Sequence, residues 1–61
     1  MIELTKLNGA PIIVNVDLIE TLEATPDTVI TFTTGKKIVV KESVESVIKK
    51  TIEFKKKTFH E

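Results

Sequence analysis

The apolar residues of this 61-residue chain change their spacing once, near residue 42. Before that point they alternate with polar residues in short runs, which is typical of β-strands that place one face on a core. After it they recur every three or four residues, which is typical of an amphipathic helix. The sequence therefore predicts an α+β fold: a small antiparallel β-meander of about five short strands followed by one C-terminal helix, forming a single domain over residues 1–61.

Turn residues separate the strand-like runs. Asn8-Gly9 is the strongest short hairpin signal and predicts a type I′ turn, in which both central residues have positive φ. Pro26-Asp27 and Gly35 mark two further turns. Because short connections force neighbouring strands to run antiparallel, we expect a meander of strands at about residues 2–7, 11–15, 18–23, 28–33 and 37–41.

The run at 18–23 can be interpreted in two ways. Leu18, Ile19 and Leu22 fit one face of a helical turn. Leu18 and Leu22 also fit a strand, although this places Glu20 on the apolar side. A six-residue helix is weak, so length favours the strand.

The helix is predicted over residues 43–57. Ser43 is a natural N-cap, because its hydroxyl can accept a free N–H of the first turn. Glu45 near the start and the lysines near the end suit the helix dipole. One stripe at helical spacing holds Val44, Val47, Ile48, Thr51, Ile52, Lys55 and Phe59.

The residues that catalysis needs are scarce. The one histidine, His60, is second from the end, and there is no cysteine to ligate a metal or form a disulfide. No glycine-rich phosphate loop occurs. We interpret the acids Asp17, Glu20, Glu23 and Asp27 as a solvated edge. The sequence therefore predicts a protein that is not an enzyme and has no catalytic residue, cofactor or metal.

Location and charge narrow the class of partner. No run approaches the ~18 apolar residues of a membrane helix. The opening Ile2-Glu3-Leu4-Thr5 alternates like a strand and does not resemble the basic and apolar regions of a signal peptide, so we expect a cytoplasmic protein without membrane insertion. The net charge is zero, but residues 1–27 carry five acids and one lysine, whereas residues 28–61 carry eight lysines and four acids. This asymmetry fits two solvated faces, a partner of either sign, or subunits packed head to tail.

Self-association is predicted from size and from an excess of apolar residues. A chain this short buries only about 60% of its unfolded surface, so a monomer would be marginal. Several apolar residues fall outside the predicted core faces, and one helix cannot cover both sides of a sheet. We therefore expect a homo-oligomer on the basis of Ile13, Val16, Ile19, Val29, Val39 and Phe54.

Contacts with another protein are expected on an exposed strand face or on the helix. Nucleic acid is not an expected partner, because the chain has no Arg, Tyr or Trp to fork phosphates or stack on bases. The predicted interaction residues are Val29, Thr31, Lys6, Lys49, Lys50 and Phe54.

Three segments resemble the flagellar FlbD family, also called the swarming motility proteins SwrD. They are residues 1–9 (MIELTKLNG), residues 17–28 (DLIETLEATPDT), and residues 35–37 with 39–44 (GKK and VVKESV). Where the family usually has Pro after Asn15, this chain has Val16. The resemblance implies a small non-catalytic accessory factor that supports flagellar motor power and swarming, with a motor or stator component as partner.

A weaker resemblance is to the carbon storage regulator CsrA family of dimeric RNA-binding proteins. It includes the opening Ile2-x-Leu4-Thr5-Lys6, the short strands and the final helix. It implies the alternative function of a post-transcriptional regulator of motility. Lys6 could stand for one RNA-binding residue of that family, but Glu42 lies where the family has a basic residue and would repel phosphate.

Overall fold

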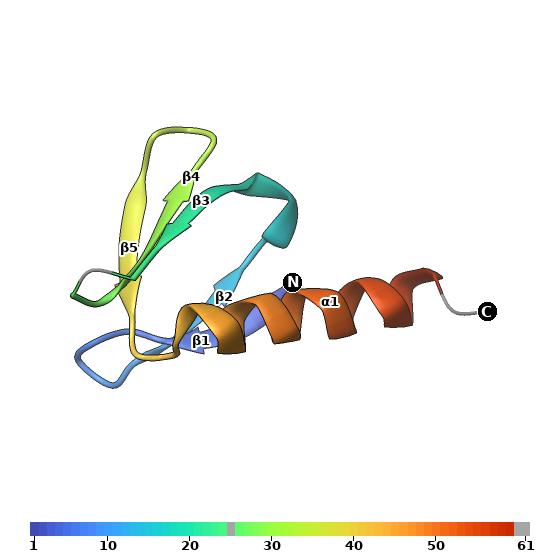
Figure 1. Cartoon of the computed structure of the whole chain (residues 1–61), viewed down its shortest axis with the longest axis horizontal. Helices are drawn as coiled ribbons and strands as arrows, with labels where there is room; N and C mark the ends of the chain where they lie inside the picture. The colour runs from blue at the N-terminus through green and yellow to red at the C-terminus, as the bar shows by residue number, and fades with distance from the viewer. Residues whose placement is uncertain (25, 60–61) are drawn as a thin grey trace.

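The structure is a computed structural model and describes residues 1–24 and 26–59. Five short strands precede one C-terminal helix, so the predicted α+β class and element order are confirmed (Figure 1). The elements are β1 (Ile2–Thr5), β2 (Pro11–Val14), the 3-10 turn η1 (Val16–Leu18), β3 (Ile19–Glu23), β4 (Thr28–Phe32), β5 (Lys37–Val40) and α1 (Val44–Phe59).

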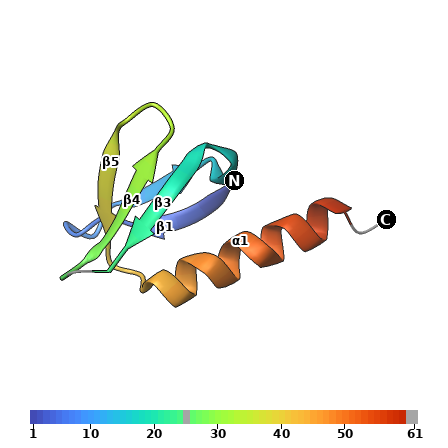
Figure 2. The same ribbon diagram turned by 45° about the horizontal axis from the view of Figure 1, so that its top comes forward.

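The strands form two antiparallel sheets rather than one continuous meander. β1 and β2 make a hairpin, and β3, β4 and β5 make a three-stranded sheet. The sheets meet where Lys6 pairs with Val40, and the N–H of Lys41 donates to the carbonyl of Thr5 at 2.8 Å. In Figure 2 the helix runs beneath both sheets and past them at its C-terminal end. Neighbouring strands therefore follow the order β2-β1-β5-β4-β3.

The break between the sheets comes from η1. The Asn15 side chain accepts the N–H of Asp17 at 3.0 Å and starts a 3-10 turn, which redirects the chain before β3. The segment predicted as either a strand or a helical turn thus contains both. A register shift between Ile19 and Thr21 leaves Glu20 as an extra residue on β3, which is a β-bulge. The bulge keeps Glu20 exposed while Leu22 still packs on the core.

The β1–β2 and β4–β5 turns are three-residue loops closed by glycine. The N–H of Gly9 donates to the carbonyl of Lys6 at 2.9 Å, and Gly9 has a φ of 92°. No non-glycine residue in the described ranges has positive φ, so the predicted type I′ turn at Asn8-Gly9 is wrong. A type I turn followed by a left-handed glycine explains the geometry. Gly35, with a φ of 91°, closes the β4–β5 turn in the same way.

The core lies between the two sheets and the helix. Its buried residues are Ile2, Leu4, Val14, Val16, Ile30, Val40 and Val47. Val16, Ile19 and Phe54 were expected outside the core, and the structure corrects this. The η1 turn folds Val16 inward, and Ile19 and Phe54 are half-buried against the cluster.

The remaining residues of that group lie outside the core, as predicted. Ile13 is exposed on β2. Val29 and Val39 lie opposite each other on β4 and β5 and are half-buried.

The helix starts where predicted and presents a different face to the core. The Ser43 hydroxyl accepts the N–H of Ser46 at 3.1 Å, which confirms the cap. Val47 is buried, and Phe54 packs against the core cluster. Ile48 and Ile52, predicted on the core stripe, are 45% and 51% exposed. The stripe is therefore rotated, because the helix packs on β1 along the side that carries Phe54.

The other predicted boundaries differ by one or two residues. The strands end earlier than expected, at Thr5, Val14, Phe32 and Val40, because the turn and connecting residues take over the backbone hydrogen bonds. The helix continues to Phe59. Thr25, which precedes the predicted turn at Pro26-Asp27, and His60 lie outside the described residues.

Replacing Gly9 by Val tests the turn. A Cβ at Gly9 would meet nothing within 4 Å, so the whole penalty comes from forcing a β-branched residue to positive φ. We expect the free energy of unfolding to fall by about 1–3 kcal/mol, measured by urea denaturation. Asn8→Ala is the matched control, because Asn8 has negative φ and loses only an exposed hydrogen bond to Ala10. Equal losses for both variants would contradict the three-residue loop.

Candidate functional site

The connection between β5 and α1 holds a carboxylate that ties the fold together. Glu42 accepts two hydrogen bonds from Thr5 on β1, one from the backbone N–H and one from the hydroxyl, each at 2.9 Å. The two residues are 37 positions apart in sequence. Glu42 therefore clamps the end of β1 to the start of the helix, next to the join between the two sheets.

The clamp changes the acidity of Glu42. Partial burial removes water from the carboxylate and by itself raises the pKa of Glu42. The hydrogen bonds from the Thr5 N–H and hydroxyl, a bond from its own backbone N–H and the charge of Lys50 act in the opposite direction and lower the pKa below its ordinary value of 4.5. The folded protein therefore favours the charged form of the Glu42 carboxylate.

Acid should therefore weaken this contact. A carboxylate with a lowered pKa in the folded state stabilises the protein above its unfolded pKa, and that stability is lost as the pH falls through the folded pKa. We expect Glu42→Gln to lower the free energy of unfolding at pH 7 by about 1–3 kcal/mol. We also expect the variant to lose less further stability than the wild type between pH 7 and pH 3.

The measurement is urea denaturation at both pH values and one protein concentration. Glu53→Gln, which neutralises an exposed helix carboxylate, is the matched control. If Glu42→Gln and Glu53→Gln change the acid sensitivity equally, the clamp does not contribute to it.

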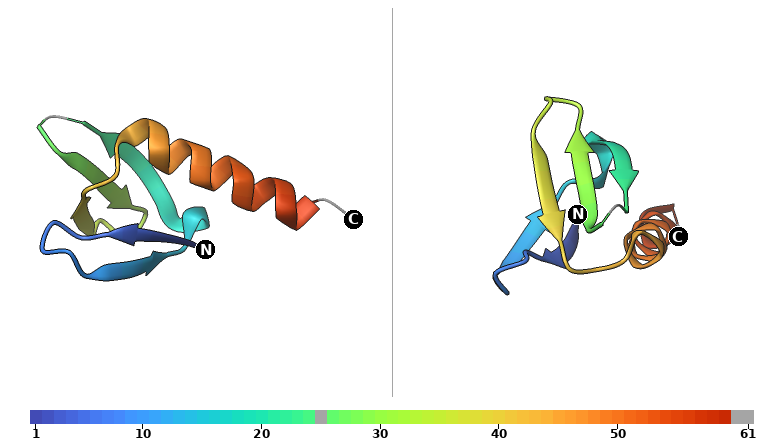
Figure 3. Two further views of the ribbon diagram at one scale, coloured as in Figure 1. Left: turned by 90° about the horizontal axis from the view of Figure 1, so that it is seen from below. Right: turned by 60° about the vertical axis from the view of Figure 1, so that its left-hand side comes forward.

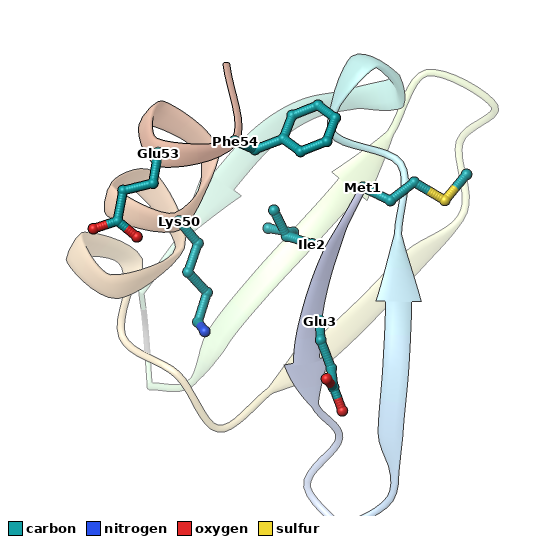
Figure 4. Close-up of a pocket in the computed structure, with 6 residues that line it drawn as sticks. All are labelled: Met1, Ile2, Glu3, Lys50, Glu53 and Phe54. Atoms are coloured by element: carbon teal, nitrogen blue, oxygen red, sulfur yellow. The ribbon is translucent and has the colours of Figure 1, made fainter. Parts of the chain in front are cut away.

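A small hollow opens between β1 and α1. Figure 4 shows its lining residues: Met1, Ile2, Glu3, Lys50, Glu53 and Phe54. Its volume is about 200 Å³, less than the roughly 300–1,000 Å³ of small-molecule pockets. Within residues 1–24 and 26–59, no group of three or more His, Cys, Asp or Glu is placed to hold a metal ion. The hollow therefore has the dimensions of a surface depression rather than of an enclosed active site.

The outer face of the three-stranded sheet carries an apolar pair inside a polar border. Val29 and Val39 are directly opposite on β4 and β5, and Glu23 of β3 is opposite Val29 on the other side. Thr31 and Lys37 form the next pair of opposite residues on the same face, two positions along each strand. Alternation points this face away from the core that Ile30 enters from the other side. We call these five residues the outer sheet face.

The structure distributes the six predicted interaction residues over several places. Val29 and Thr31 lie together on the outer sheet face, and Lys50 and Phe54 both line the hollow. Lys6 is exposed at the join of the sheets, and Lys49 is exposed on the helix.

Sequence reasoning missed two features. The first is Glu42 as a clamp, which only a contact across 37 positions reveals. The second is the exposed pair Ile48 and Ile52. The spacing of the apolar residues in the helix did contain a signal for this pair. Val47 and Phe54 are seven residues apart and form one apolar line, and Ile48 and Ile52 form another on a different side of the helix.

The predicted acidic edge is exposed at all four positions: Asp17, Glu20, Glu23 and Asp27. Asp17 lies 3.8 Å from the ammonium of Lys55, a contact between two exposed side chains. Such contacts contribute little stability. In the part of the chain that the structure describes, no helix is long and apolar enough to cross a membrane.

A comparison with protein families shows which family the chain belongs to. A family model described as "FlbD: Flagellar and Swarming motility proteins" matches residues 1–59. The chain belongs to the FlbD family. The match covers every described strand and the helix. No curated protein matches the chain, and no solved structure does.

Membership of the FlbD family confirms the resemblance seen in the sequence. It supports a role in flagellar and swarming motility. Val16, where the resemblance implied a Pro, opens η1 and is buried in the core.

Proposed function

We propose that this FlbD-family protein is a non-catalytic, cytoplasmic accessory factor that supports flagellar motor power through protein–protein contacts and acts as a homo-oligomer. The observation that carries the proposal is the outer sheet face. It presents the half-buried Val29–Val39 pair with Glu23, Thr31 and Lys37 around it. A motor or stator component is the proposed partner.

An apolar centre with a polar border is the usual anatomy of a protein interface. The centre contributes affinity when water is excluded from it, and the border sets orientation. Here the border carries both signs of charge, in Glu23 and Lys37. A mixed border favours a protein partner over a uniformly charged nucleic acid backbone.

RNA regulation is the competing class of function. Glu42 argues against it, because hydrogen bonds from Thr5 favour the charged form of this carboxylate close to Lys6, which directly follows β1 and is exposed. A negative charge at that point would repel a phosphate. The two classes predict opposite effects for substitutions at Lys6 and on the outer sheet face.

Swarm expansion rate separates the two classes. We expect Val29→Lys to slow swarming strongly, because a charge in the apolar centre prevents a dry contact. The variant should still fold, since Glu23 is directly opposite and can accompany the new ammonium. Lys6→Ala is the matched comparison and should swarm like the wild type. Circular dichroism of both purified variants checks the fold.

The reverse pattern would contradict the proposal. If Lys6→Ala abolishes swarming while Val29→Lys leaves it unchanged, the protein acts through the Lys6 region. Tight RNA binding that weakens steeply with salt would then assign the regulatory function.

A further inference from the structure

The helix carries an apolar line that the core does not use. Ile48 and Ile52 are one turn apart on α1 and are 45% and 51% exposed. The core takes Val47 and Phe54 from a neighbouring face of the same helix. α1 is thus apolar on two adjacent faces, and an isolated molecule buries only one of them.

The charges beside this line are separated along the helix axis. Glu45 lies in the first turn, and Lys56 lies near the other end. Eleven residues separate them, close to three full turns, so both lie along one edge of the exposed line. A single α1 therefore has an acidic start and a basic end on the same edge.

Two such helices complement each other when they run antiparallel. A twofold axis at about residue 50 places Ile48 of one copy against Ile52 of the other. The same axis places Glu45 against Lys56, because the midpoint between residues 45 and 56 nearly coincides with the midpoint between residues 48 and 52. An antiparallel twofold keeps equivalent edges on the same side, and it also opposes the helix dipoles favourably. A parallel twofold would instead place these edges on opposite sides of the pair, so Glu45 would not face Lys56.

The remaining groups near the line are compatible with this arrangement. Lys55 already contacts Asp17 of η1 at 3.8 Å, on the opposite edge. Lys49 lies further round the helix and meets its own copy near the axis, where its long side chain can keep the ammonium in water. In Figures 2 and 3 the C-terminal end of α1 extends past the sheets.

We propose that the Ile48–Ile52 line of α1 is the self-association surface, on which a second copy packs with its α1 antiparallel and with Glu45 facing Lys56. This inference rests on the homo-oligomer of the proposed function and specifies its interface. Burial of one short apolar line is a modest driving force against the cost of association. The dimer should therefore dissociate on dilution and weaken when Ile48 is replaced by Asp.

A charge-exchange experiment tests the antiparallel contact. Glu45→Lys and Lys56→Glu are prepared as separate full-length proteins and checked by circular dichroism. Each variant alone places like charges opposite each other, so we expect its dimer to dissociate at least tenfold more readily than the wild type. Mixed in equal amounts, they restore Lys–Glu contacts at both ends, and a heterodimer should form with near wild-type affinity. Sedimentation equilibrium over a concentration series is the measurement.

Two results would overturn the inference. One is a wild-type protein that stays at 6.8 kDa across the series. The other is a dimer that Ile48→Asp or either charge variant leaves intact, which would place the interface elsewhere. Neither result involves the outer sheet face, so swarming of Val29→Lys tests the proposed protein contacts independently.

Discussion

The bond between Glu42 and Thr5 is the contact on which the arrangement of this small fold depends. Without a disulfide, the chain must hold two sheets and a helix together through its core and a few polar links. Glu42 supplies such a link where β1, β5 and the start of α1 converge, and both of its oxygens are used. The adjacent Lys41–Thr5 backbone bond joins the sheets at the same point. The hydrophobic core can then close between elements whose relative positions are set.

Local chemistry determined the elements that the sequence could predict. Strand alternation, the Ser43 cap and the change of period near residue 42 each involve neighbours in the chain, and each is present in the structure. The errors arose where tertiary packing decides. The bulge at Glu20 shifts the alternation of β3, and the rotation of α1 exposes Ile48 and Ile52. Spacing does not show the bulge, and on α1 it offers two apolar lines without deciding which of them another element covers.

The glycine turns show the same limit at smaller scale. Asn8-Gly9 correctly marked a hairpin, but loop length was set by the pairing of Lys6 with Ala10 across the turn. For the candidate site, the sequence placed Val29 and Thr31 on one face and identified the residues outside the core only in part. Val16 joined the core, and Ile19 and Phe54 pack against it, which left Ile13, Val29 and Val39 as the members of the predicted excess that lie outside it.

We propose that this FlbD-family protein acts on motility through protein contacts made by the outer sheet face. The most direct measurement is co-purification of the tagged protein from motile cells, with and without nuclease, in parallel with its Val29→Lys variant. We expect the wild type to retain a flagellar motor or stator component after nuclease treatment and the variant to lose it. Retention that disappears with nuclease, or that is equal for wild type and variant, would contradict it.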